Sequence, residues 1–179
     1  MLGFILNLQY PKTLEDAEDS FNIWTNRGLD CVENAAALHK TKALVHIGTW
    51  SAPAWANPGD ICFFGYAKSA LTHIARLQHE AEEDGKPALA LAIKSSRDVY
   101  DEIGGKVFGF AYVGEKPKPA PGHKDHNSLC LAHMYNYKNI EPIAFSDIAG
   151  LQINSYGGVT RLSHESLEML CAEAGIGNG

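Results

Sequence analysis

Hydrophobic positions along the chain fall into short runs typical of buried strands and longer stretches with helical spacing. The runs predict strands at residues 4–10, 61–66, 88–93 and 106–113, with further extended segments at 129–137 and 140–145. Helical spacing predicts helices near 13–26, 69–83 and 164–174, and a shorter one at 97–103. Ser163 is placed to cap the last helix.

These elements predict an α+β protein in which strands occur singly between short helices and loops. The chain shows no regular β–α alternation and no glycine-rich phosphate loop, so a doubly wound parallel sheet is not expected. We expect a twisted mixed sheet or a small β-barrel flanked by short helices. With 179 residues, the chain suits a single domain spanning 1–179.

Composition narrows the class of protein further. Hydrophobic residues make up 45% of the chain, yet no apolar run approaches the roughly 20 residues that a membrane span needs. The first residues lack the basic stretch and cleavage site of a secretory signal. The four cysteines form no CxxC pair. We therefore expect a cytoplasmic protein with free thiols and no membrane partner.

The charge balance bears on the kind of partner. A formal net charge of −6 argues against coating nucleic acid through phosphate contacts alone. Basic residues nevertheless gather between 104 and 140, in and around a Pro-rich loop. Lys116, Lys118 and Lys124 lie there, and we expect them to contact phosphate groups of a ligand.

Aromatic residues are the strongest sign of a binding site in the sequence. Trp50 and Trp55 occur in a Pro- and Ala-rich stretch that is difficult to bury, Tyr66 follows a strand end, and Tyr137 lies on a later strand. About half of the clustered aromatics are expected to be core. The others can offer flat walls to a planar or cationic ligand, and we expect Tyr66 to lie outside the core.

Three segments, in order, resemble the EVE/PUA-like superfamily of nucleic-acid-binding domains. The first is Asn57-Pro58-Gly59-Asp60 with the strand after it, and the second is the strand at 106–113. The third runs from 137 to 148 and continues at 157–163 into a terminal helix. The resemblance covers about half the chain and implies a PUA-like sheet or barrel. Residues 69–105 would then be an insertion between two barrel strands.

The resemblance implies a reader of nucleobases that needs no cofactor and catalyses nothing. In EVE-type domains an aromatic pocket receives a flipped base, often a modified one. Tyr66 and the segment with Asn154, Ser155 and Tyr156 match the pocket positions, whereas the two tryptophans match only by neighbourhood. The implied partner is nucleic acid containing a modified base, or a free nucleotide.

A small hydrolase is the alternative from a different class. His39 and His126 each begin a His-x-Thr/Ser tripeptide, which would suit a two-histidine phosphoesterase with both imidazoles facing one cleft. Cys31 at a helix start, with His73 downstream, would suit a thiol hydrolase, in an order similar to that of NlpC/P60 peptidases. The histidine of those enzymes lies on a strand, whereas His73 falls in the predicted helix at 69–83.

No metal site is predicted. His123, Asp125, His126 and His133 lie close together in sequence, but their spacing is not that of a zinc site. We expect His123, Asp125 and His126 to lie in a solvated loop.

Overall fold

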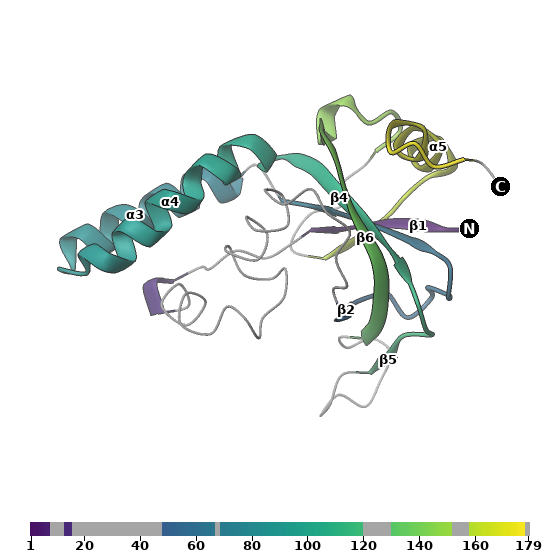
Figure 1. Ribbon diagram of the computed structural model, residues 1–179, viewed down its shortest axis with the longest axis horizontal. Helices are drawn as coiled ribbons and strands as arrows, with labels where there is room; N and C mark the ends of the chain where they lie inside the picture. Colours follow the sequence, from purple (N-terminus) through teal and green to yellow (C-terminus); the bar gives the residue numbers. More distant parts are fainter. Residues whose placement is uncertain (8–12, 16–47, 67–68, 120–129, 152–157, 178–179) are drawn as a thin grey trace.

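The computed structural model describes residues 1–7, 13–15, 48–66, 69–119, 130–151 and 158–177, which form a mixed α+β protein around one curved sheet (Figure 1). Within these residues the strand order is β2-β6-β4-β3-β1-β7, and β5 pairs with β6 outside that path. β1 and β3 are parallel, and the other neighbours are antiparallel. The strands are β1 (Gly3–Asn7), β2 (Gly48–Ser51), β3 (Ile61–Gly65), β4 (Lys106–Val113), β5 (Lys118–Pro119), β6 (Cys130–Ala144) and β7 (Val159–Arg161).

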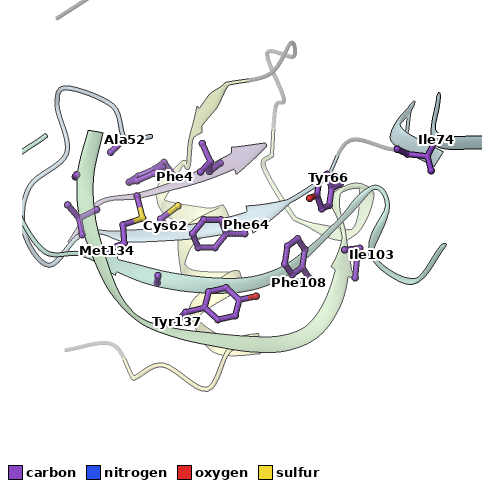
Figure 2. Packing of buried hydrophobic residues seen from close by; sticks show 14 of the residues in the cluster. Phe4, Ala52, Cys62, Phe64, Tyr66, Ile74, Ile103, Phe108, Met134 and Tyr137 are labelled. Carbon is purple, nitrogen blue, oxygen red and sulfur yellow. The ribbon is translucent and has the colours of Figure 1, made fainter. Parts of the chain in front are cut away.

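The two central strands β1 and β3 are buried along their whole length because both faces of the sheet are covered. Phe4, Phe64 and Tyr137 belong to the core cluster on one face, called here the Phe64 face (Figure 2). Ile5 and Phe63 point to the other face, where they share a second cluster with residues of α5 (His164–Glu173). That side is called the α5 face.

The Asn57–Asp60 segment forms the turn that starts β3. Gly59 has φ +90°, and the Asp60 N–H donates to the Asn57 carbonyl at 3.0 Å, as in a turn with proline second and glycine third. The buried Asp60 carboxylate accepts the backbone N–H groups of Leu2 at 2.9 Å and Asn57 at 2.8 Å. The Gly-Asp pair therefore joins the start of β3 to the residue just before β1.

β6 is one long strand whose pairing with β4 has two register irregularities, whereas two extended segments were predicted. Its pairing with β4 shifts register between Phe110 and Tyr112. Asn136 has φ +55°, a conformation that asparagine tolerates better than most residues. Met134 and Tyr137 are both buried on the Phe64 face although they are an odd number of residues apart. Asn136 thus supplies the extra residue of a β-bulge that turns Tyr137 inward.

The helices α3 (Ser69–Glu83) and α4 (Pro87–Ile103) connect β3 to β4 as a hairpin that extends away from the sheet (Figure 1). The prediction of a strand at 88–93 is wrong, because this segment is the first part of α4. A short apolar run does not distinguish a strand from a helix, and Pro87 followed by alanine and leucine favours the helix. Ala90 and Ile93 are buried while Leu91 is exposed, which is helical spacing.

The remaining predictions are confirmed where the described residues cover them. The strand at 106–113 is β4, the helix at 69–83 is α3, and the helix at 164–174 corresponds to α5. The strands predicted at 61–66 and 4–10 correspond to β3 and β1, with 8–10 outside the described residues. The helix at 97–103 is the second part of α4, and most of 13–26 lies outside the described residues. Ser163 caps α5 by accepting the Ser166 N–H at 3.1 Å.

Of the helices in the described residues, none combines the length and the apolar character needed to cross a membrane.

Candidate functional site

Trp55 lies where the segment after β2 returns to the sheet. Its indole is half-buried and meets Phe4 of β1 edge-on, with ring centroids 5.7 Å apart and an interplanar angle of 85°. The guanidinium carbon of Arg161 lies over the same ring, 4.9 Å from its centroid, which is a cation–π distance. Trp55 is therefore fixed from one side by the core and stacked with a cation.

The β1–β7 register explains why Arg161 reaches Trp55. Phe4 and Arg161 are direct cross-strand partners, so their side chains share one face of the sheet. Phe4 is buried there against Trp55, while Arg161 on β7 is exposed. Among the described residues, no carboxylate lies within ion-pair distance of Arg161. Its guanidinium is therefore not neutralised by a carboxylate of the described residues.

Lys116 brings a second cation to this place. Its Nζ donates to the carbonyl oxygen of Ala56, the residue after Trp55, at 2.9 Å and lies 3.4 Å from Asn57 Oδ1. The Asn57 side-chain amide in turn donates to the Trp55 carbonyl at 3.4 Å. The Trp55 site, defined as Trp55, Arg161 and Lys116, thus combines an aromatic face with two positive charges.

Two carboxylates that lie close in sequence to residues of the Trp55 site accept hydrogen bonds from backbone N–H groups. Asp60 accepts two N–H groups in the turn before β3, and Glu115 Oε1 accepts the His133 N–H at 2.9 Å. These bonds hold both acids in place on the fold. Lys116 is left with backbone and amide oxygens as its nearest partners, and Lys118 is exposed on β5.

Tyr66 does not lie in the Trp55 site. The prediction that it lies outside the core is wrong, because it is fully buried and its ring stacks on Phe108 with centroids 6.0 Å apart and planes 11° apart. Tyr66 continues the alternation of β3, so it points to the Phe64 face like Phe64. The sequence could not show that this face is covered at the strand end.

Tyr137 is also fully buried, on the inner side of the curved strand β6 (Figure 2). Its ring packs against Phe64 at a centroid distance of 5.7 Å, and its hydroxyl donates to Asn139 Oδ1 at 2.6 Å. Burial raises the pKa of the Tyr137 phenol above its usual range, so the group stays neutral and serves as a donor. The core position gives Tyr137 a packing role.

The other predicted ligand residues are described only in part. Trp50 pairs through its backbone with Ala132 of β6. Lys124 and the run Asn154, Ser155 and Tyr156 lie outside the described residues. Their predicted contacts with the ligand stay predictions.

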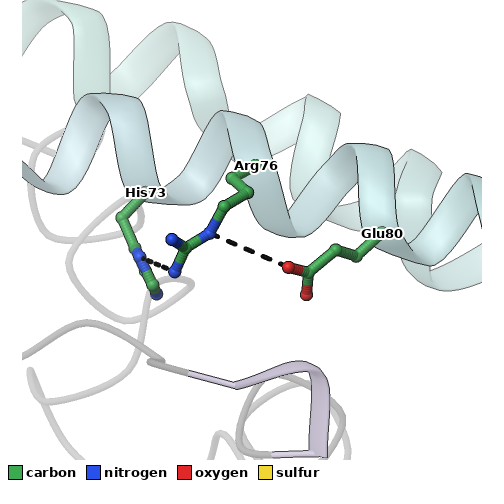
Figure 3. Close-up of polar contacts among 3 residues, drawn as sticks. All are labelled: His73, Arg76 and Glu80. Carbon is green, nitrogen blue, oxygen red and sulfur yellow. Dashed lines mark hydrogen bonds and ion pairs between the residues drawn. The ribbon is translucent and has the colours of Figure 1, made fainter.

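The residues of the hydrolase alternatives are not brought together in the described part of the chain. His39, His126 and Cys31 lie outside it. His73 lies on α3, as its helical spacing predicts, and its Nδ1 is 2.7 Å from an Arg76 guanidinium nitrogen (Figure 3). Among the described residues, no group of three or more histidine, cysteine or carboxylate side chains could hold a metal ion.

The sequence analysis did not single out two residues with notable positions. The position of Arg161 depends on the register between β1 and β7, which are far apart in the chain. Asn7 is a polar residue within the apolar run of β1, which is a signal that could have been used. Its side-chain oxygen is buried and has no hydrogen-bond partner among the residues that the structure describes.

Comparison with known proteins adds one distant similarity. No protein-family model matches the chain, and no curated protein matches it. A similar solved structure is the NMR structure of Rpa0253 from Rhodopseudomonas palustris, which is 11% identical and superposes with a TM-score of 0.47. The match covers 98% of this chain and 94% of that one. A similarity at this level carries no argument about function.

Proposed function

We propose that this protein is a binding module for a nucleobase or nucleotide, including a modified base in nucleic acid, and that it catalyses no reaction. The observation that supports this most directly is the Arg161 guanidinium over the Trp55 ring at an exposed edge. A base can stack on an arginine plane or an aromatic ring, and the guanidinium N–H groups suit a phosphate or a base edge.

The charges near the Trp55 site favour a ligand with few phosphates. Lys116 and Lys118 can each contact one phosphate, while the chain as a whole carries a net charge of −6. Stacking yields roughly 1–3 kcal/mol per base, and extruding a base from a duplex costs a few kcal/mol. An unpaired base or a free nucleotide avoids that cost and is the expected ligand.

We also propose that the sheet is PUA-like. The support is the order of the three sequence segments, which form β3, β4 and the β6–β7 region of a single sheet. The Gly-Asp pair of the first segment has a clear structural role at the start of β3. In this proposal α3 and α4 are the addition between two strands.

The test is a binding titration by fluorescence anisotropy or calorimetry with two ligand sets. One set contains the nucleoside 5′-monophosphates, and the other contains single-stranded oligonucleotides with and without methylated cytosine or adenine. We expect wild-type binding at low salt and a loss of roughly tenfold or more in Trp55→Ala, because stacking is removed. Arg161→Lys keeps the charge but loses the planar fork, so it too should bind more weakly.

Arg76→Ala is the matched control for charge. Arg76 is exposed on α3 and interacts with His73 and, at 3.8 Å, with Glu80 (Figure 3). The Arg76→Ala substitution removes one positive charge on the helical hairpin and should leave the affinity for the ligand unchanged. Lys118→Ala should weaken the binding of all phosphate-bearing ligands to a similar extent and lower the salt dependence of that binding. The binding of nucleosides should be unaffected. No binding by the wild type at low salt would contradict the proposal.

A further inference from the structure

A turn at residues 148–151, just after the short helix η3 (Phe145–Asp147), lies against α5. The Leu151 N–H donates to the Ile148 carbonyl at 3.3 Å, and Gly150 has φ +74°, as in a turn with glycine third. Ile148 is buried in the cluster on the α5 face. Ala149, the second residue of the turn, takes no part in the turn's own hydrogen bond. Its N–H and carbonyl are therefore left for partners outside the turn.

Both backbone groups of Ala149 bond to side chains of α5. The Ser166 hydroxyl donates to the Ala149 carbonyl at 2.7 Å. The Ala149 N–H donates to Met169 Sδ at 3.3 Å. Ser166 and Met169 are three residues apart on α5, so they are neighbours on one side of the helix. The two side chains together hold the turn against α5, and Met169 does so through its sulfur atom.

The three methionines of the chain differ in their exposure to solvent. Met134 is fully buried on the Phe64 face, and Met1 is 61% exposed. Met169 is half-buried against the cluster on the α5 face, and its hydrogen bond with the Ala149 N–H lies at the protein surface. A small oxidant in solution can therefore reach the Met169 sulfur, which also makes a defined contact with the turn.

A methionine thioether reacts with a peroxide in a two-electron step. A sulfur lone pair attacks one peroxide oxygen, the O–O bond breaks and an S–O bond forms. The proton on the transferred oxygen passes to the departing oxygen, which leaves as water from hydrogen peroxide or as an alcohol from an alkyl hydroperoxide. The sulfur is oxidised by two electrons and the peroxide is reduced by two. Methionine sulfoxide reductases reverse the change.

The geometry at Ala149 does not accommodate the sulfoxide oxygen between the bonded atoms. An N–H···O bond alone needs about 2.9 Å, so an oxygen placed between Ala149 N and Met169 Sδ, 3.3 Å apart, does not fit. The Ser166 bond and the burial of Ile148 prevent the turn from moving away without further loss. The sulfoxide also brings a polar oxygen to a side chain that packs against an apolar cluster.

We infer that Met169 is a site of reversible oxidation by peroxides, and that its sulfoxide form weakens the contact between α5 and the turn at 148–151. This goes beyond the proposed function and does not depend on it. Met169 packs on the α5 face, whereas Trp55 packs against the cluster on the Phe64 face.

Peptide mapping by mass spectrometry after treatment with hydrogen peroxide tests the first part. In the folded protein, Met169 should be oxidised at least about tenfold faster than Met134, because reactivity follows exposure. In urea that unfolds the chain, the two rates should agree within about twofold. Equal rates in the folded protein would overturn the inference, because Met169 would then be no more accessible than a core methionine.

Met169→Leu is the matched variant for the second part, because it keeps the side-chain volume and has no sulfur. Peroxide treatment should lower the melting temperature of the wild type by about 2–4 °C and shift the ¹H–¹⁵N signal of the Ala149 amide. Methionine sulfoxide reductases should restore both. The melting temperature of Met169→Leu should not change on treatment, although this variant keeps the four cysteines and the other two methionines.

Two results would overturn the second part. An Ala149 signal that stays in place after Met169 is oxidised would mean that the sulfur does not hold this N–H. An equal fall in the melting temperature of the wild type and Met169→Leu would assign the effect to the cysteines or to another methionine.

Discussion

Gly109 of β4 lies directly beneath the Tyr137 ring, and substituting it tests the packing of the Phe64 face. A Cβ at this position would collide with the Tyr137 hydroxyl and would lie 2.6 Å from Cζ and 2.9 Å from Cε2. The ring cannot simply move aside, because Phe64 packs against it and the hydroxyl is bonded to Asn139. Gly109→Ala must therefore displace a fully buried side chain.

The expected cost has two parts. Overpacking of a core costs about 1–3 kcal/mol, and the loss of the Tyr137–Asn139 hydrogen bond costs about 1 kcal/mol. We expect Gly109→Ala to lower the free energy of unfolding by about 3 kcal/mol. For a chain of this length that corresponds to a fall in the melting temperature of about 6–12 °C.

Urea denaturation of four variants measures this effect. Gly158→Ala is the control, because nothing lies within 4 Å of a Cβ there, and it should change stability by less than about 0.5 kcal/mol. Tyr137→Leu removes the colliding atoms, so Gly109→Ala combined with Tyr137→Leu should cost less than the two single changes added together. Wild-type stability in Gly109→Ala, or strict additivity, would refute the packing described for Tyr137.

Three further predictions concern the fold. Burial raises the pKa of Tyr137, so the folded protein holds the phenol proton more tightly than the unfolded chain does. The free energy of unfolding should therefore fall as pH rises above about 10. Over the same pH range, the urea midpoint of Tyr137→Phe should fall less than that of the wild type. Asp60→Asn loses one of two carboxylate acceptors for backbone amides and should cost about 1–3 kcal/mol in urea denaturation, whereas exposed Asp147→Asn should cost almost nothing. Asn136→Val should cost about 1–2 kcal/mol because of its positive φ, while thermal melting of Asn136→Gly should match the wild type.

The spacing of hydrophobic residues was enough to predict the elements in which that spacing fits only one kind of secondary structure. The amphipathic spacing of residues 69–83 and the aromatic and β-branched run at 106–113 identify α3 and β4 within a residue. The strand prediction at 88–93 failed because a run of six apolar residues does not by itself distinguish a strand from a helix, and here the run packs against α3 as part of α4.

The candidate site was only partly accessible from sequence. Trp55 was identified from its Pro- and Ala-rich surroundings, and Lys116 from its charge. Tyr66 was misplaced because a strand pattern shows which residues share a face but does not show what covers that face. Arg161 was missed because its place over Trp55 depends on the β1–β7 register, which no local pattern encodes.

The central claim is that Arg161 and Trp55 act together to bind a base, and a double-mutant cycle measured by calorimetry tests it most directly. The ligand is the tightest-binding nucleotide of the titration set, measured against the wild type, Trp55→Ala, Arg161→Ala and the double variant. Each single change should weaken binding roughly tenfold, and the double change should cost clearly less than the sum of the two, because the guanidinium loses its aromatic partner when the indole is removed. Wild-type affinity in both single variants, or no binding of any nucleotide to the wild type, would contradict it.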